Sequence, residues 1–189
     1  MRIVLASSSP RRHELMKEFN LPFEVIVKEV DETFSGNSDV YHDSMEVSKK
    51  KAMAVFKDIS GDVIVIGSDT IVVQDGKIYG KPKDYDDAFD MLTKFSDNHH
   101  EVVSSLCLLI RRDGIEYEEL TYDKADVYFD KLTKEEIDNW INSNDVYSKA
   151  GAYAIQEGFG KHIKKIDGDY FSIVGLPIHK LYKLLKKYV

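Results

Sequence analysis

Two periods of apolar residues alternate along the 189-residue chain. Short runs that are apolar throughout or at every second position predict strands, and apolar residues spaced by three or four predict helices. The predicted strands lie at 2–6, 23–27, 62–80 with a hairpin turn at Asp75-Gly76, 101–129 with a turn at Asp113-Gly114, and 161–175 as a last hairpin. The predicted helices lie at 10–19, 42–59, 84–96, 132–141 and 177–189.

This order of elements indicates the fold class. Strands and helices alternate at first, and a strand-rich middle follows, which is typical of α/β proteins with a mixed sheet. We therefore expect one domain over 1–189, with a mixed sheet flanked by helices and divided into two lobes. The stretch "FSGNSD" at 34–39 predicts a polar loop, and Thr133 with Glu136 predicts a capping box.

Composition narrows the function classes. Hydrophobic residues make up 43% and charged residues 31% of the chain, as in ordinary globular proteins. The formal net charge of -7 disfavours broad nucleic-acid binding, which needs a basic face, but it permits a local basic pocket for a small anion. Cys107 is the only cysteine and lies in an apolar run, so we expect a buried thiol and no disulfide.

Targeting signals are not expected. The first apolar run, "IVLA", is too short for a signal peptide, and no stretch approaches the roughly 20 apolar residues of a membrane span. We expect a cytoplasmic protein without a membrane partner.

The opening stretch "RIVLASSSPRRHELM" carries the first candidate chemistry. Pro10 fits the first helical position, with Ser9 as N-cap. Arg11 and Arg12 then lie where the helix dipole disfavours cations by roughly 0.3–1 kcal/mol each. An anion at the helix terminus would explain them, and phosphate suits arginine best. The alternative is a capped surface helix with two solvated arginines.

The stretch "VIVIGSDTIVV" places one charge, Asp69, in an apolar strand. An unpaired carboxylate there would be costly, so Asp69 must be paired, bind a metal or face a cleft. Gly67 permits a close backbone approach or a bulge beside it. The functional interpretation is a metal ligand or general base near phosphate, and the alternative is a structural aspartate that accepts turn N–H bonds.

Other charged residues are weaker candidates. The acidic cluster Glu29, Asp31 and Glu32 could supply a second oxygen ligand for Mg²⁺, although such clusters are more often solvated loops. Among three consecutive lysines, Lys51 is nearest the apolar stripe of its helix and could turn inward. Lys81 follows a strand in "YGKPKD", on a restrained loop that suits a phosphate-binding ammonium.

The stretch "KAGAYAIQEGFG" contains Gln156, whose amide could read a nucleobase edge or could simply be a polar loop side chain. His99 and His100 lack metal-ligand spacing, and we expect both to be exposed. The chain shows no Walker-type glycine loop and no Ser-His-Asp order, so the sequence gives little support to a covalent mechanism.

Five segments together resemble the Maf family of nucleoside triphosphate pyrophosphatases, in the order and spacing of that family. They are "LASSSPRRHELM", "IGSDTIVV", "GKPKD", "KAGAYAIQ" and "KKIDGDYFSIVGLP". The resemblance implies a Maf/ITPase-like α/β fold with a nucleotide-binding cleft between two lobes. It also implies cleavage of the α–β phosphoanhydride of a nucleoside triphosphate, with a divalent cation such as Mg²⁺ or Mn²⁺, to give pyrophosphate. Members are described as housecleaning enzymes, are linked to arrest of septum formation and often form homodimers.

The resemblance also implies residue roles. Asp69 would be the proton acceptor and, with Glu32, a metal ligand. Base specificity would lie with Arg11, Thr70 and Gln156, and phosphate binding with Ser7, Arg12, Lys51 and Lys81. The segment "AGAYAIQ" resembles the branch that acts on dTTP and UTP. The chain departs from the family pattern at Ser68, at Ser148 and in "EGFGKH".

Three rival functions stay open at this point. The first is a non-catalytic nucleotide-binding regulator of cell division that uses the same pocket. The second is an enzyme of the branch directed at methylated guanine nucleotides. The third, a structural interaction protein, leaves Asp69 and the paired arginines unexplained.

Overall fold

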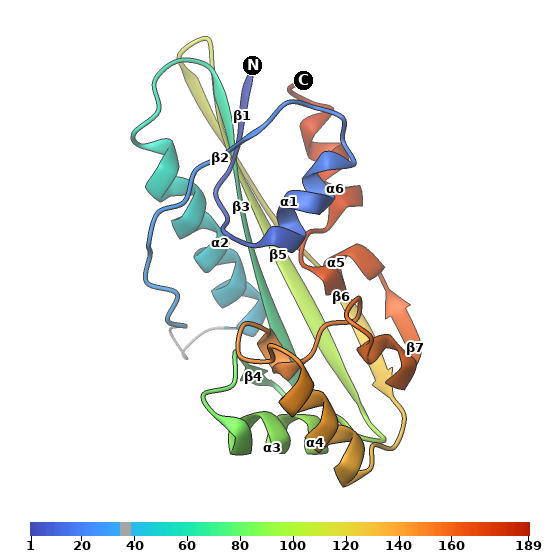
Figure 1. The fold of residues 1–189 in the computed structure, drawn as a ribbon. Helices are drawn as coiled ribbons and strands as arrows, with labels where there is room; N and C mark the ends of the chain where they lie inside the picture. Colours follow the sequence, from blue (N-terminus) through green and yellow to red (C-terminus); the bar gives the residue numbers. More distant parts are fainter. Residues whose placement is uncertain (35–38) are drawn as a thin grey trace. The chain divides into compact units, whose positions relative to one another are not determined.

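A computed structural model of the chain describes residues 1–34 and 39–189, so part of the predicted loop at 34–39 lies outside the described residues. Figure 1 shows the elements. The strands are β1 (Arg2–Leu5), β2 (Glu24–Val25), β3 (Val63–Gln74), β4 (Lys77–Tyr79), β5 (His99–Arg112), β6 (Ile115–Phe129) and β7 (Ile163–Gly168). The helices are α1 (Pro10–Lys17), α2 (Val40–Phe56), α3 (Tyr85–Phe95), α4 (Lys134–Ser143), α5 (Tyr170–Val174) and α6 (Ile178–Leu185), with 3₁₀ helices η1 (Ala150–Ala152) and η2 (Phe159–His162).

The strands form one mixed sheet in the order β2-β1-β3-β5-β6-β7, and β4 pairs with β3. The strand β1 is parallel to both β2 and β3, whereas β3 with β4 and β6 with β7 are antiparallel. The predicted mixed α/β sheet flanked by helices is therefore confirmed. The nucleotide-binding cleft expected between two lobes stays a prediction.

The chain divides into two compact units, and β3, β5 and β6 contribute residues to both. The first unit comprises Met1–Thr70, Ser104–Asp123 and Gly175–Val189. The second unit comprises Ile71–Val103 and Lys124–Val174. Each unit has its own hydrophobic core.

In the first unit, successive strand residues feed two separate apolar clusters, because side chains of a strand point to alternate faces of a sheet. Ile3, Leu5, Ile64 and Ile66 pack on one face with residues of α1 and α6. The intervening strand residues pack on the other face with Ala52, Val55 and Phe56 of α2; they include Val4, Val63, Val65 and Cys107. Helices thus cover both faces of this part of the sheet.

Cys107 is fully buried, as predicted, and burial raises the pKa of its thiol to about 12. The thiol is therefore protonated and unreactive near neutral pH.

The core of the second unit is rich in aromatic residues. Phe95, Phe129, Tyr153 and Phe159 are buried together with Trp140, and several of their rings meet edge to face. The helix α4 enters this core through the predicted capping box of Thr133 and Glu136, which is confirmed.

Three sequence predictions are wrong in detail. The strand expected at 23–27 is shorter and spans only Glu24–Val25, with both residues exposed at the edge of the sheet. The last hairpin has one strand, β7, because the carboxylate of Asp169 accepts bonds from the backbone N–H and hydroxyl of Ser172 and so favours the short helix α5.

His100 was expected to be exposed, but it is 1% exposed. Its Nε2 lies 2.7 Å from the hydroxyl of Tyr153. His99, beside it, is exposed as predicted. Strand alternation turns one of two adjacent histidines inward, which a search for metal-ligand spacing does not detect.

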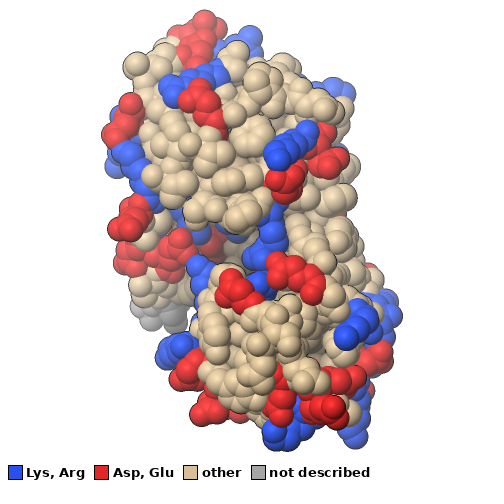
Figure 2. Space-filling model, viewed as in Figure 1, with Lys and Arg blue, Asp and Glu red and all other residues tan. Residues whose placement is uncertain are grey.

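The face shown in Figure 2 mixes acidic and basic side chains. Within the ranges 1–34 and 39–189, no helix has the length and apolar content needed to cross a membrane.

Candidate functional site

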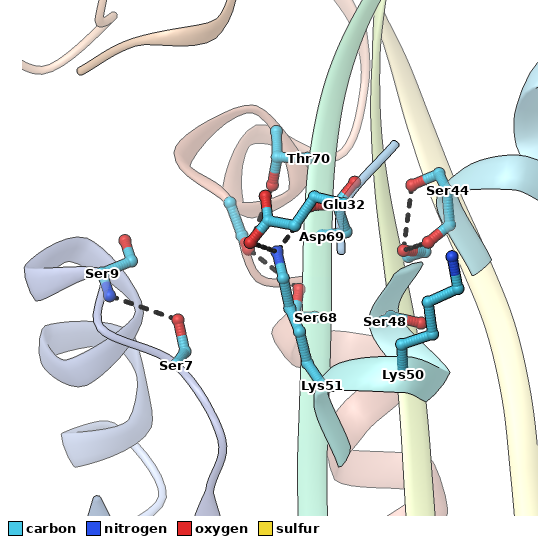
Figure 3. Close-up of polar contacts among 12 residues, drawn as sticks. Ser7, Ser9, Glu32, Ser44, Ser48, Lys50, Lys51, Ser68, Asp69 and Thr70 are labelled. Carbon is cyan, nitrogen blue, oxygen red and sulfur yellow. Dashed lines mark hydrogen bonds and ion pairs between the residues drawn. The ribbon is translucent and has the colours of Figure 1, made fainter. Parts of the chain in front are cut away.

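The loop between β1 and α1 places Ser7 beside the first turn of α1 (Figure 3). Ser7 is 5% exposed, and its hydroxyl accepts a hydrogen bond from the backbone N–H of Ser9 at 3.2 Å. Ser9 occupies the N-cap position and Pro10 the first helical position, as predicted, but the Ser9 side chain makes no capping bond. The first-turn N–H groups of α1 have no acceptor within the helix, which makes this terminus suitable for an anion.

Arg12 is buried at the centre of a hydrogen-bond network. Its Nε donates to the carbonyl oxygen of Gly175 at 2.8 Å, its Nη1 to Ser7 Oγ at 3.2 Å and its Nη2 to Thr70 Oγ1 at 2.9 Å. Burial lowers the pKa of Arg12, and the charge of Asp69 opposes that shift. Arg12 therefore joins the α1 terminus to β3 and to Gly175.

Arg11 lies on the same turn and is half-buried. Its charge is close enough to lower the pKa of Arg12 further. Arg12 differs from Arg11 because three of its N–H groups donate to other groups of the protein. The sequence alone does not show whether an arginine at this position binds the protein itself or a phosphate. The predicted phosphate contact of Arg12 stays a prediction.

Asp69 is paired, as the sequence required, and its partner is Lys51 of α2 (Figure 3). The ammonium of Lys51 donates to Asp69 Oδ1 at 2.8 Å and lies 3.1 Å from Glu32 Oε1. Lys51 is thus the inward-turned lysine of its run. Of the acidic cluster, Glu32 reaches Lys51, whereas the carboxylate of Asp31 accepts a bond from the backbone N–H of Thr33.

Close packing between α2 and β3 produces this ion pair. A Cβ atom at Gly67 would lie 2.1 Å from the carbonyl oxygen of Ser48 and 3.0 Å from the backbone nitrogen of Ala52. Only glycine therefore allows the backbone of α2 to pass so close to β3. Lys51 is consequently held next to the strand position that carries Asp69.

One oxygen of Asp69 differs from the other. Asp69 is 6% exposed, and its Oδ2 is buried with no hydrogen-bond partner among residues 1–34 and 39–189. A buried carboxylate oxygen without a partner is costly, so a ligand atom, a water or a cation is expected to meet it.

Thr70, next to Asp69, shares its hydroxyl with two groups besides Arg12. It lies 2.8 Å from Ser104 Oγ and 3.4 Å from the carbonyl oxygen of Gly175. Ser68 also donates to Gly175, at 3.2 Å. The Gly175 carbonyl thus fixes β3 and Arg12 together.

Sequence analysis missed Ser104 and Gly175. The signal for Ser104 was a pair of serines inside the apolar run "VVSSLCLL". Gly175 contributes its backbone carbonyl oxygen, which every residue type has, so its identity does not indicate this role. Its φ of 125° is favourable only for glycine.

Lys81 and Gln156 both belong to the second unit and are both exposed. The two segments that carry them are joined, because the backbone N–H of Gly151 donates to the carbonyl oxygen of Gly80 at 3.0 Å. In the first unit, the structure therefore joins Ser7, Arg12 and Thr70 by hydrogen bonds and joins Asp69, Lys51 and Glu32 by ion pairs, and the two groups meet at the neighbouring residues Asp69 and Thr70. In the second unit, it connects the segments that carry Lys81 and Gln156.

The carboxylates of Asp69 and Glu32 are suitable ligands for a hard divalent cation whose other ligands come from substrate phosphates and waters. Asp69 provides its buried Oδ2. Glu32 contacts the same Lys51 ammonium as Asp69, and its side chain is 54% exposed. No group of three His, Cys, Asp or Glu residues suited to a metal occurs in the part of the chain that the structure describes. Mg²⁺ is commonly bound by one or two carboxylates, substrate phosphates and waters, so this pair is sufficient.

Together, the fold and this network define an α/β protein that has, in one unit, a helix terminus suited to an anion, the buried carboxylate of Asp69 and the exposed carboxylate of Glu32. The chain matches the family model described as "Maf-like protein" over residues 2–188. This protein therefore belongs to the Maf family.

Its relatives cover nearly the whole chain. The dTTP/UTP pyrophosphatase of Thermoanaerobacter sp. (strain X514) is 45% identical over 187 residues, which cover 99% of this chain and 96% of that protein. The dTTP/UTP pyrophosphatase of Clostridium novyi (strain NT) is 43% identical, covering 97% and 96%. Among solved structures, the Ham1 protein of Staphylococcus aureus covers 100% of both chains with a TM-score of 0.55 and 15% identity, a likeness of fold alone.

Proposed function

We propose that this protein is a metal-dependent pyrophosphatase that hydrolyses dTTP and UTP to the monophosphate and pyrophosphate. Its relatives at 40–45% identity that carry the name dTTP/UTP pyrophosphatase support the substrate. The observation that carries the chemistry is the environment of Asp69: Lys51 holds its Oδ1, while its Oδ2 is buried and has no partner in the part of the chain that the structure describes.

This asymmetry suits a general base. Lys51 fixes the carboxylate through Oδ1, so the lone pairs of Oδ2 point in a set direction. A water bound there would give its proton to Oδ2 as its oxygen attacks the α-phosphorus. Because Lys51 is 14% exposed, its charge is only partly screened and also balances the negative charge that develops.

The triphosphate requires several cations. In our proposal, the α1 terminus, Ser7 and Lys81 contact phosphate oxygens, and Arg12 acts there through Ser7 and Thr70 as well as by its charge. A divalent cation bound by Asp69 and Glu32 would supply charge neutralisation and a water of lowered pKa.

Base selection is assigned to three residues from the resemblance: Arg11, Thr70 and Gln156. Thr70 is held by Arg12 and Ser104, so its hydroxyl has a fixed position. Gln156 is exposed in the second unit, which leaves its amide accessible to a ligand.

The test is a substrate panel scored by product. The purified protein is incubated with dTTP, UTP, dCTP or a 7-methylguanine nucleoside triphosphate, with Mg²⁺ or with a chelator. We expect pyrophosphate from dTTP and UTP, little from the others, and none with the chelator. Orthophosphate as first product would reject the bond of attack, and preference for the methylated guanine nucleotide would assign the protein to the other branch. Tight binding of dTTP without turnover would favour a regulator.

A further inference from the structure

Lys149 is a buried charge outside the network described in the first unit. It is 3% exposed, and its Nζ lies 3.0 Å from Glu157 Oε2 and donates to the carbonyl oxygen of Asp145. The two residues of this ion pair bracket Gln156 in the sequence. We call residues 149–157 the 149–157 loop.

A buried ammonium is an expensive way to hold a loop. The attraction between the charges often does no more than offset the loss of hydration, and an apolar pair of similar volume commonly stabilises a protein as well. Unlike an apolar contact, a hydrogen-bonded ion pair is directional, so it fixes both the distance and the orientation of the two groups. The Lys149–Glu157 ion pair therefore indicates that the conformation of this loop has to be fixed.

Three further contacts fix the first half of the loop. The backbone N–H of Gly151 donates to Gly80, the indole Nε1 of Trp140 donates to the carbonyl oxygen of Ala152 at 3.0 Å, and Tyr153 bonds His100. Ala152 adopts a φ of 64°, an uncommon conformation for a residue with a Cβ, which these contacts hold in place.

The second half of the loop depends on Glu157. Gln156 and Glu157 are both exposed, and the backbone N–H of Glu157 donates to the carbonyl oxygen of Ala154 at 3.2 Å. The ion pair to Lys149 joins this end of the loop to its buried start. Gln156 thus lies between an anchor at Tyr153 and an anchor at Glu157.

A fixed position matters for an amide. Thymine and uracil present an N3–H donor and an O4 acceptor, whereas cytosine presents an acceptor and an N4 donor. A glutamine amide has both a donor and an acceptor, and rotating it by half a turn exchanges them. A loosely held Gln156 would therefore accept either base, and only a fixed one discriminates.

We propose that the Lys149–Glu157 ion pair holds Gln156 in the orientation that selects thymine and uracil over cytosine, so that Lys149 and Glu157 are positioning residues for base choice. This inference rests on the proposed function and on the role given there to Gln156.

The test compares Glu157→Gln with wild type, because Glu157 is exposed and its loss leaves the core intact. We expect the ratio of kcat/KM for dTTP to kcat/KM for dCTP to fall about tenfold, with kcat for dTTP within about threefold of wild type. The matched control is Asp167→Asn, which removes the acid of an exposed ion pair in the same unit, Lys165 with Asp167 at 3.0 Å. The control should leave the ratio unchanged.

A double-mutant cycle separates the pair from its members. Lys149→Met and the double variant Lys149→Met/Glu157→Gln should lower the ratio no further than Glu157→Gln alone, because each removes the same interaction. Additive effects on the ratio, or a loss of thermal stability with an unchanged ratio, would overturn the proposal.

Amide hydrogen exchange without nucleotide gives a readout that does not need activity. We expect Glu157→Gln to speed exchange at least about tenfold within 154–157, and Asp167→Asn to leave it unchanged there. Unchanged exchange in Glu157→Gln would overturn the positioning role even in an active enzyme. If exchange is faster in Glu157→Gln but the wild-type protein releases no pyrophosphate from dTTP or UTP, the proposed function is rejected and, with it, the role in base choice.

Discussion

Lys51 in the first unit and Lys149 in the second unit both have little solvent exposure, and they have different partners. Lys51 in the first unit is 14% exposed and is shared by the carboxylates of Asp69 and Glu32. Lys149 in the second unit is 4% exposed in its side chain and contacts one carboxylate, from Glu157, and one backbone carbonyl. The first ammonium thus joins a buried carboxylate to an exposed one, and the second joins an exposed carboxylate to a backbone carbonyl.

This difference separates a reactive cluster from a structural one. Around Lys51, the buried Oδ2 of Asp69 has no hydrogen-bond partner among the described residues, and a cation or a water can satisfy it. Around Lys149, the carboxylate of Glu157 is exposed and its contact joins the two ends of the 149–157 loop, so the pair is suited to hold that loop. Substitutions at the two lysines should therefore change different properties of the enzyme.

The largest expected effect is that of Asp69→Asn. It keeps the shape of the side chain but removes the proton acceptor, so we expect kcat to fall by about 10³-fold while binding of dTTP persists. Pyrophosphate release and equilibrium binding check this. An activity within about threefold of wild type would favour a nucleotide-binding regulator.

Lys51→Met should rank second and sharpens the contrast with Lys149→Met. It leaves the carboxylates of Asp69 and Glu32 without their shared cation, so we expect kcat to fall by about 10²-fold and the free energy of unfolding to fall by about 3 kcal/mol. Lys149→Met should change the choice between dTTP and dCTP while kcat for dTTP stays within about threefold. Equal losses of kcat in the two variants would remove the distinction between the clusters.

The next prediction concerns the pH dependence of stability, which is affected by the buried neutral imidazole of His100 in the second unit. Burial lowers the pKa of His100 from 6.5 to about 3, and the charge of His99 adds to that shift. Between these values the unfolded chain binds the extra proton, so stability from this group is complete above about pH 6.5 and is lost as pH falls, by up to about 1.4 kcal/mol per pH unit.

Denaturant titrations at pH 7, 6, 5 and 4 check this slope. His100→Phe should flatten it relative to wild type, even though it also leaves the Tyr153 hydroxyl without its partner. His99→Phe is the matched control, because His99 is the exposed neighbour, and it should keep most of the wild-type slope. Parallel curves for wild type and His100→Phe would contradict the buried neutral state.

The smallest expected effect tests the exposed member of the Lys51 cluster. Glu32→Gln should raise the Mg²⁺ concentration needed for half-maximal activity about tenfold, because one of two carboxylate ligands loses its charge. The control is Glu118→Gln, since Glu118 pairs with Lys49 of the same helix at 2.8 Å. A Mg²⁺ dependence that stays at the wild-type value in Glu32→Gln would place the cation elsewhere.

Most elements of this fold and the chemical character of the site follow from the amino-acid sequence alone. Apolar periodicity located the long strands and helices, and the turns at Asp75-Gly76 and Asp113-Gly114 were evident because few residues tolerate positive φ. A single carboxylate in an apolar strand required a partner on energetic grounds alone, and Asp69 has one.

The partner of each polar group, by contrast, depends on tertiary packing. The pairing of Asp69 with Lys51 depends on how closely α2 approaches Gly67, and the burial of His100 depends on which way a strand faces. The carbonyl of Gly175 and the pairing of Lys149 with Glu157 likewise arise when separate segments pack together. Local propensity fixes where chains turn and coil, but distances between residues far apart in sequence are set by packing, which no local pattern records.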